Sequence, residues 1–159
     1  MRSRKRFAGL ILFILYLIVL ADVLFLLRGS AMHIPLADYA RMNTNLTAFR
    51  TIKGYLHAME RYGLSGGGMI WWHNLAGNLV LFLPMGILLP ALFPPFRSFF
   101  RTVPFTMLLI VCVEGAQLLT RTGSCDVDDL ILNAAGCVAG YVIYRLTFGL
   151  TQGRSQMPG

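Results

Sequence analysis

Charged residues are scarce in this chain of 159 residues. They make up 13% of it, whereas hydrophobic residues make up 56%, and the mean hydropathy is +0.63. Soluble globular domains carry about 25% charged residues. The scarcity of charge therefore excludes an ordinary soluble domain and predicts a membrane protein.

Among the charged residues, acidic ones are scarcer than basic ones. Seven Asp and Glu stand against fourteen Lys and Arg, which gives a net charge of +7. Such an excess can indicate nucleic-acid binding when the basic residues cluster on a soluble domain. Here they are spread between apolar segments, so we expect attraction to anionic lipid and no nucleic-acid partner.

Cofactor-binding and catalytic motifs are lacking as well. Cys112, Cys125 and Cys137 have no metal-ligand spacing, and the three histidines stand far apart. The sequence has no glycine-rich phosphate loop, no nucleophile elbow and no His-x-x-x-His pair. We therefore predict no cofactor, and the cysteines indicate neither a disulfide framework nor a redox compartment.

Long apolar segments, in contrast, are abundant. The first, residues 7–27, is interrupted only by Asp22 and meets the roughly 20 residues that a helix needs to cross a bilayer core of about 30 Å. It exceeds the apolar core of about 7–15 residues in a cleaved signal peptide, so we expect it to be retained. The sequence predicts one domain, residues 1–159, with membrane-crossing helices at about 7–27, 71–93, 104–120 and 129–149.

Basic residues set the predicted orientation. Arg2, Arg4, Lys5 and Arg6 precede the first apolar segment, and basic residues beside a first helix favour the cytoplasmic side. An even number of crossings returns the chain to that side. We therefore predict a multi-pass protein of the cell membrane with both termini in the cytoplasm.

The longest polar connection spans residues 28–70. Within residues 46–62, apolar residues recur at helical spacing on one side, opposite charged residues on the other. This pattern predicts an amphipathic helix on the membrane surface or over the mouth of the bundle. The predicted fold class is an all-α membrane protein with four transmembrane helices and an outer-face amphipathic helix between the first and second.

Two features predict how the helices pack. Pro84 lacks the backbone donor that a helix interior requires, so a kink is expected there. Gly136 and Gly140 form a pair of small residues in the last apolar segment. Such pairs favour close packing against a neighbouring helix.

The densest group of polar side chains lies in CVEGAQLLTRTGSCDVDDLILNAAG, residues 112–136. Because its flanks are apolar, burying these side chains costs free energy unless they are paired or exposed to water. Helical spacing places them on two faces: Glu114, Gln117 and Arg121 at i, i+3 and i+7 of the third helix, Asp129 and Asn133 at i and i+4 of the fourth. Because only a short turn separates the two helices, these faces can meet.

The carboxylates of this stretch allow several interpretations. Glu114 lies about two turns, or roughly 10 Å, from the outer end of its helix. A carboxylate at that depth must be protonated, paired or exposed to water, and Arg121 is the expected partner. A divalent-metal site of Glu114, Asp126, Asp128 and Asp129 is an alternative, but the spacing lacks a calcium-loop pattern and we predict no metal. Asp128 could instead cap the fourth helix.

Seven residues form the predicted ligand-binding site at the outer face, because Asn78 of the second helix can join the cluster. They are Asn78, Glu114, Gln117, Arg121, Asp126, Asp129 and Asn133. The alternative is that these residues only fix the register of a helix bundle. Interhelical hydrogen bonds of this sort contribute about 0.6–2 kcal/mol each.

These residues also carry a resemblance to a known family. NLAGNLVLFLPMGILLP and VEGAQLLTRTGSCDVDDLILNAAGCVAGY resemble the VanZ-like family of small bacterial membrane proteins over about residues 43–145. The chain departs from the family pattern at Ala48, where the family has proline. The pattern falls on Asn78, Phe82, Pro84, Gly86, Glu114, Gln117, Arg121, Asp126, Asp129, Asn133, Gly136 and Gly140.

The resemblance implies lowered susceptibility to teicoplanin-type glycopeptide antibiotics in some members, with no agreed catalytic mechanism. Our leading hypothesis is a protein that binds a lipid headgroup or a lipid-linked cell-envelope precursor. Arg121 would contact a phosphate, Glu114 and Asp129 would orient it, and residues 46–62 would cover the site. A second hypothesis is a membrane-embedded enzyme acting on an envelope lipid, with Glu114 or Asp129 as general base. A third is a structural or accessory helix bundle.

Overall fold

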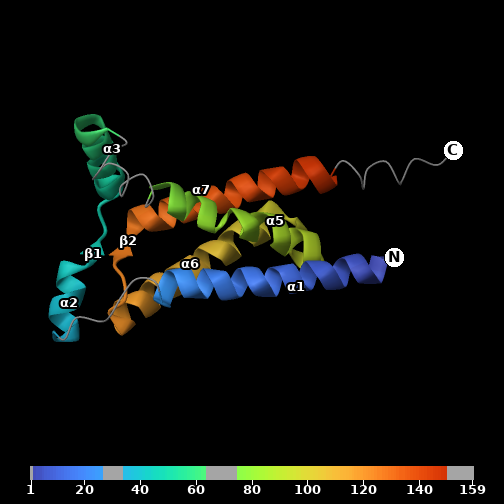
Figure 1. Cartoon of the computed structure of the whole chain (residues 1–159), viewed down its shortest axis with the longest axis horizontal. Helices are drawn as coiled ribbons and strands as arrows, with labels where there is room; N and C mark the ends of the chain where they lie inside the picture. Colours follow the sequence, from blue (N-terminus) through green and yellow to red (C-terminus); the bar gives the residue numbers. More distant parts are fainter. Residues whose placement is uncertain (1, 27–33, 64–74, 150–159) are drawn as a thin grey trace.

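The computed structural model describes residues 2–26, 34–63 and 75–149 and is almost entirely helical (Figure 1). The elements are α1 (Arg2–Ala21), η1 (Asp22–Leu26), α2 (Leu36–Met42), β1 (Thr44–Asn45), α3 (Arg50–Tyr62), α5 (Leu83–Leu92), η2 (Pro94–Arg97), α6 (Phe99–Thr120), β2 (Cys125–Asp126), α7 (Val127–Tyr144) and η3 (Arg145–Gly149). The chain is also helical over residues 75–81. We call the end of the bundle with α2, α3, β1 and β2 the loop end, and the end where α1 begins and η3 ends the terminal end (Figure 1).

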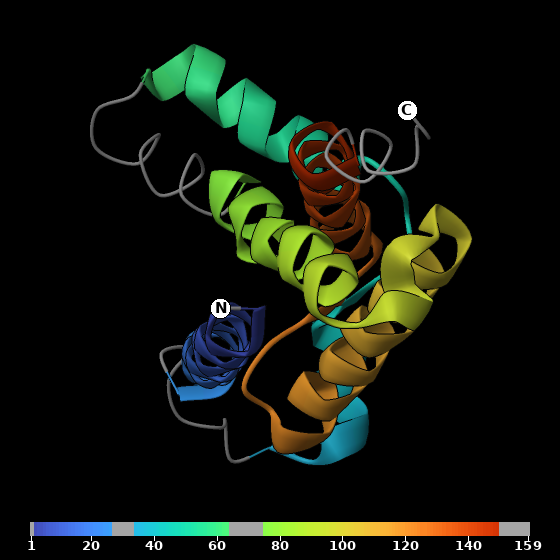
Figure 2. The same ribbon diagram turned by 90° about the vertical axis from the view of Figure 1, so that its right-hand side faces the viewer.

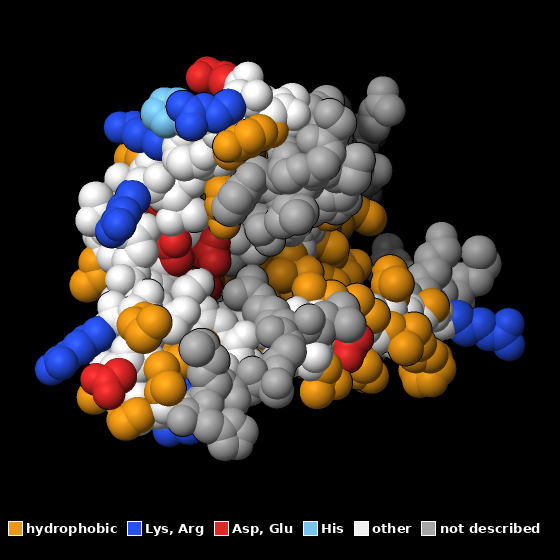
Figure 3. Space-filling view, turned by 60° about the vertical axis from the view of Figure 1, so that its left-hand side comes forward, with side chains coloured by type: hydrophobic (Ala, Val, Ile, Leu, Met, Phe, Trp, Pro, Cys, Tyr) orange, Lys and Arg blue, Asp and Glu red, His pale blue; other side chains and the backbone are white. Residues whose placement is uncertain are grey.

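Four helices are long and apolar enough to cross a membrane, which confirms the predicted fold class. They span Arg6–Leu26, Leu75–Leu92, Phe99–Thr120 and Val127–Phe148. Many of their large apolar side chains are exposed, especially along α1, and the space-filling view shows them over much of one face of the bundle (Figure 3). This outward apolar surface is the one that lipid tails would cover.

The third crossing begins earlier than the sequence indicates. We predicted a start at about residue 104, whereas α6 begins at Phe99. The carbonyl of Ser98 accepts the N–H groups of Arg101 and Thr102 at 3.1 and 3.0 Å, which starts the helix. Pro104 removes a single backbone donor near this start and does not end the helix.

The break in the second crossing lies at Phe82, two residues before the proline that causes it. The helix is formed over residues 75–81, is interrupted at Phe82 and resumes as α5. Pro84 cannot donate a hydrogen bond back to the carbonyl of Val80, so the helical ladder fails just ahead of it. Pro84 thus occupies the first turn of α5, where proline is tolerated.

Helix α5 stands between α1 and α7, as the view down the bundle shows (Figure 2). A Cβ atom added at Gly136 would clash with the carbonyl oxygen of Leu79, and one at Gly140 with that of Leu83. The predicted close packing at these glycines is therefore confirmed, and the partner is the helix that contains α5. On its other side, Tyr16 of α1 donates to the carbonyl of Leu81 at 2.9 Å.

The loop end is closed by the predicted amphipathic helix, by a short helix and by a pair of strands. We did not predict the short helix or the strand pair. Helix α3 lies across the loop end, has no buried residue and carries an apolar and a charged side (Figure 1). The short helix α2 precedes it. Strands β1 and β2 form a parallel pair, Thr44 opposite Cys125 and Asn45 opposite Asp126, which joins this segment to the turn between α6 and α7.

Candidate functional site

Helix α6 carries two of the predicted site residues into the interior near the loop end. Glu114 is 7% exposed and Gln117 is completely buried. The Nε2 group of Gln117 donates to the carbonyl of Leu24 in η1 at 2.7 Å, which ties α6 to the end of the first crossing. That carbonyl lies in a π-helical turn, where the backbone departs from the α-helical ladder.

The expected pair of Glu114 with Arg121 is not formed. Over the residues that the structure describes, there is no ion pair between them, and a partner of Glu114 is the backbone N–H of Asp126, which donates to Oε2 at 3.2 Å. Helix α6 ends at Thr120, and Arg121 has a left-handed backbone with φ +58°. Because the helix does not continue through Arg121, this residue does not extend the face on which Glu114 lies.

Asp126 is the N-cap of α7, the role that the sequence suggested for Asp128. Its Oδ1 accepts the backbone N–H of Asp128 at 2.9 Å and the Nδ2 group of Asn45 at 3.0 Å. Its Oδ2 accepts the hydroxyl of Thr51 at 2.6 Å. Both oxygens are thus used to join the start of α7 to β1 and α3, which makes Asp126 a structural residue as well as a predicted ligand.

Asp128 caps a different helix from the one expected. Its side chain is completely buried, and its carboxylate accepts backbone N–H groups from the start of α3. Thr51 and Ile52 donate to Oδ2 at 2.7 and 3.1 Å, and Phe49 donates to Oδ1. A carboxylate at the positive end of a helix dipole is a stabilising arrangement. Asp128 therefore fixes α3 over the loop end from a position more than seventy residues away in sequence.

Asn78 and Asp129 join the second crossing to the fourth. The Nδ2 group of Asn78 donates to Oδ1 of Asp129, and the two side chains are 7% and 8% exposed. One turn further along α7, Asn133 is buried at 2% exposure. The structure thus brings Asn78, Asp129 and Asn133 to the same interior region of the bundle, between the α7 N-terminus and the helix that precedes α5.

Buried polar atoms without partners concentrate in the predicted site. Among the described residues, four buried side-chain atoms have no hydrogen-bond partner: Thr106 Oγ1, Gln117 Oε1, Arg121 Nε and Asn133 Oδ1. Three of these four belong to the seven predicted residues. Each such atom costs on the order of 1–3 kcal/mol when it is left without a partner. Of the three atoms in the predicted site, two are acceptors and one is a donor. They therefore suit a ligand that carries both hydrogen-bond donors and acceptors.

The carboxylates open onto a recess at the loop end. Glu114, Asp126 and Asp129 keep 7–8% exposure, whereas Asp128 has none. Figure 3 shows acidic side chains set back from the surface. A polar cavity of about 310 Å³ adjoins this region; it is lined by Met42, Asn43, Thr44, Asn45, Arg50, Thr51, Ser124 and Asp126. We call Glu114, Asp126 and Asp129, with this cavity, the acidic recess.

Negative charge in the acidic recess affects a neighbouring thiol. The pKa of Cys125, in β2, is raised above its ordinary value, first by burial and then by the charges of Glu114 and Asp126. A raised pKa keeps the thiol protonated and weakly nucleophilic at neutral pH. This argues against Cys125 as a reactive group. The described residues also contain no group of three or more His, Cys, Asp or Glu side chains that could hold a metal ion.

We predicted from the sequence that residues 46–62 would cover the site, but we missed residues 39–45 and the contacts that join both segments to residues 123–128. Asn45 and Thr51 contact Asp126, and the hydroxyl of Tyr39 donates to the carbonyl of Gly123 at 2.9 Å. A local signal existed, because Asn and Thr ahead of an amphipathic helix commonly form turns and caps. Here Asn45 Oδ1 accepts the backbone N–H of Thr47 at 3.1 Å. What local spacing could not show was the partner segment at residues 123–128.

Four apolar crossings, with an outward apolar surface and polar residues gathered at one end, define a multi-pass helical membrane protein. The chain belongs to the VanZ/LLP1 family, whose sequence profile matches residues 13–148. The match begins before residue 43, where we first placed the resemblance, and so includes most of α1. Comparison with curated proteins and with solved structures gives no match.

Proposed function

We propose that this membrane protein binds the polar headgroup of a membrane lipid, or of a lipid-linked cell-envelope precursor, at the acidic recess together with the predicted site residues Gln117, Arg121 and Asn133. The observation that carries the proposal is the set of buried atoms without partners, Gln117 Oε1, Arg121 Nε and Asn133 Oδ1. A bound headgroup that paired with them would recover free energy that the protein alone leaves unused.

The chemistry of the seven predicted site residues narrows the class of headgroup. Carboxylates of Glu114 and Asp129 and the amide oxygen of Asn133 accept hydrogen bonds, whereas the guanidinium of Arg121 donates them. The complementary headgroup carries several hydroxyl or ammonium donors beside one anionic group, such as a sugar phosphate or an amino phosphodiester. Arg121 would contact the phosphate, because a guanidinium fork matches its oxygens.

The backbone at Arg121 supports a binding role for this side chain. A non-glycine residue with φ near +58° costs on the order of 1–3 kcal/mol, and such residues concentrate at functional sites. Glycine would occupy the position at less cost. An arginine here retains a large cation at the turn in spite of an unfavourable backbone conformation.

Helix α3 completes the proposed site as its cover. Asp128 anchors its first turn directly beside Asp126, at the edge of the acidic recess. We further propose that the loop end faces the outside of the cell membrane and that both termini are cytoplasmic. A headgroup held there would compete with a lipid-anchored glycopeptide for the membrane surface, which would account for lowered susceptibility to teicoplanin.

The test is a set of three charge-removing variants, Glu114→Gln, Asp129→Asn and Arg121→Gly. The third also relieves the left-handed strain, so it removes the guanidinium without an expected loss of stability. Matched controls at exposed positions of α2 and α3 are Glu60→Gln, Asp38→Asn and Arg61→Gly. Each variant is scored for abundance in the membrane, for teicoplanin susceptibility of the host and for lipids that copurify.

We expect the three site variants to keep normal abundance, to lose the copurifying lipid and to lose any protection that the parent chain confers. The controls should keep all three properties. Loss of abundance together with loss of lipid would assign the residues to the register of the bundle instead. Recovery of the lipid in chemically altered form from the parent, but not from Glu114→Gln or Asp129→Asn, would make the protein an enzyme.

A further inference from the structure

The terminal end of the bundle carries a second cavity, far from the acidic recess. Its volume is about 500 Å³, and it is lined by Arg6, Gly9, Leu88, Ala91, Leu92, Pro94, Arg97 and Phe148. Two arginines thus meet an otherwise mostly apolar lining, one from α1 and one from η2. A cavity of this size can hold a substantial part of a small ligand or of a lipid.

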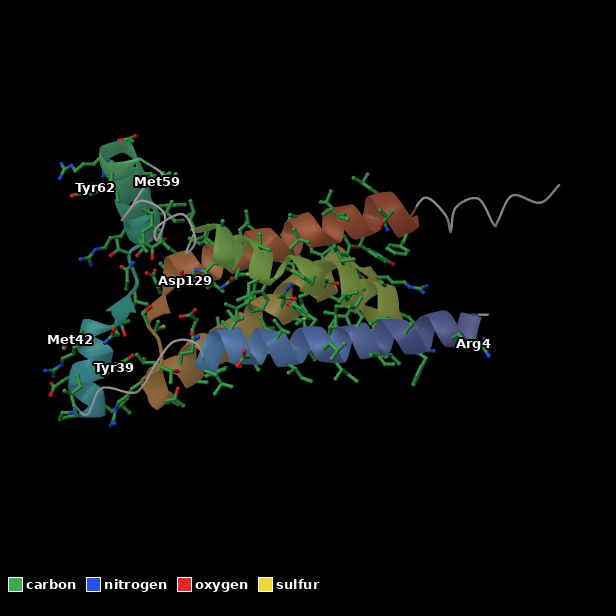
Figure 4. All side chains as sticks on the ribbon, viewed as in Figure 1. Arg4, Tyr39, Met42, Met59, Tyr62 and Asp129 are labelled. Atoms are coloured by element: carbon green, nitrogen blue, oxygen red, sulfur yellow. The ribbon has the colours of Figure 1, made fainter. Side chains whose placement is uncertain are left out.

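Within the described part of the chain, the two guanidinium groups have no anionic partner. Over the described residues, neither Arg6 nor Arg97 makes an ion pair or a side-chain hydrogen bond, and both are exposed. All seven acidic residues of the chain lie in η1, in α2 and α3, or toward the loop end in α6, β2 and α7. Figure 4 shows this separation through Arg4 and Asp129, which lie at opposite ends of the bundle. An anion that neutralises Arg6 and Arg97 must therefore come from outside the chain's acidic side chains.

Packing contacts hold the cavity in shape. The hydroxyl of Tyr141 in α7 donates to the carbonyl of Arg97 at 2.6 Å and fixes the η2 turn against the last crossing. Gly9 lets α1 approach α5, because a Cβ atom there would lie 2.7 Å from Cδ2 of Leu92. Arg6 lies about one turn from Gly9 on the same face of α1. The cavity is therefore built by three crossings and η2, and does not depend on a loose surface loop.

We propose that this cavity binds an anionic phospholipid, with its phosphate between Arg6 and Arg97 and one acyl chain along Leu88, Ala91 and Leu92. Leu88, Ala91 and Leu92 lie on one face of α5 and lead from the η2 turn toward the membrane interior. A soluble anion would contact only the arginines, whereas a lipid also covers the apolar lining. This site does not rest on the proposed function of the loop end, and the orientation given above would place it in the cytoplasmic leaflet.

The test counts lipids bound to the purified full-length protein in neutral detergent by native mass spectrometry. Phosphatidylglycerol and phosphatidylcholine with the same acyl chains are titrated separately. The variant pair Arg6→Gln and Arg97→Gln is compared with the charge-matched pair Arg4→Gln and Arg101→Gln, which lies at the same end but does not line the cavity. We expect tighter binding of phosphatidylglycerol, weakened about 30-fold by the first pair and less than about 3-fold by the second.

Three results would overturn this proposal. Equal binding of the two lipids would show that the cavity does not recognise the anionic headgroup. Equal losses of affinity in both variant pairs would show that binding depends only on diffuse surface charge. Displacement of phosphatidylglycerol by inorganic phosphate alone would assign the arginines to a soluble anion. A third variant, Ala91→Phe, fills the apolar part of the cavity and keeps both arginines, so it should also lose the lipid. Unchanged binding would contradict the placement of the acyl chain. Thermal unfolding of each variant shows whether it is folded.

Discussion

Asp128 in α7 holds the backbone of Thr51 in α3, with 2.7 Å between Oδ2 and the amide nitrogen, although 77 residues separate them in sequence. The neighbouring amides of Phe49 and Ile52 bind the same carboxylate. One completely buried side chain therefore supplies the acceptors for the first turn of a helix that itself buries no residue. The attachment of α3 to the bundle depends strongly on this contact.

Replacing Asp128 should detach α3 without unfolding the four crossings. In Asp128→Ala, three amides lose a charged acceptor, and hydrogen bonds to charged groups contribute about 1.5–3 kcal/mol each. Asp128→Asn keeps one oxygen acceptor and should give a smaller effect. Hydrogen exchange of residues 49–52 in detergent measures the change, which we expect to be tenfold or more for Asp128→Ala. The exposed Asp38→Asn serves as the control, and unchanged exchange in Asp128→Ala would show that α3 is held by other contacts.

Adding a methyl group at Gly136 should weaken the contact between the second and fourth crossings. The new Cβ meets the backbone carbonyl of Leu79, which cannot move aside as a side-chain terminus could. We expect Gly136→Ala to lower the free energy of unfolding by about 1–3 kcal/mol, the usual cost of overpacking. Gly77→Ala is the matched control, since a Cβ there meets nothing within 4 Å. It should be neutral or stabilising by about 0.5–1 kcal/mol, because alanine favours the helix. Unfolding in detergent compares the two, and equal stabilities would refute the close contact.

The titration of Cys125 reports on charge in the acidic recess. Burial and the negative charges of Glu114 and Asp126 disfavour the thiolate and raise its pKa. Glu114→Gln removes one of these charges, so the pKa of Cys125 should fall toward its ordinary value while the contribution of burial remains. The pH dependence of alkylation in a Cys112→Ser background measures the shift. Glu60→Gln, an exposed site on α3, should leave the profile unchanged; a profile unaffected by Glu114→Gln would mean that Glu114 is uncharged.

Helical periodicity predicted most of the fold because each crossing carries its own signal. A run of about twenty apolar residues indicates a crossing wherever it occurs, and the spacing of residues 46–62 indicates α3. The start of α6 at Phe99 was missed because apolar length locates a membrane core and not the helix that extends beyond it. Helix α2 and the β1–β2 pair were missed because their partners lie about eighty residues away.

The candidate site was predictable on the helices and unpredictable at their ends. Periodicity placed Glu114 with Gln117 and Asp129 with Asn133, and all four are buried. It failed at Arg121, since the helix stops one residue earlier and the left-handed backbone ends the periodicity. It also suggested Asp128 as the cap of the fourth helix, a role that Asp126 has, because which helix a carboxylate caps depends on a tertiary contact. The ligand-binding role of these residues stays a prediction.

The turn at residues 126–129 has a mechanical consequence. Asp126 and Asp128 hold the surface helix α3, whereas Asp129, the next residue, holds Asn78 in the second crossing. These contacts all start from residues 126–129, which end β2 and begin α7. A small rotation of that turn would tilt α3 and pull on the second crossing together. A change in the recess would thereby reach both α3 and the second crossing.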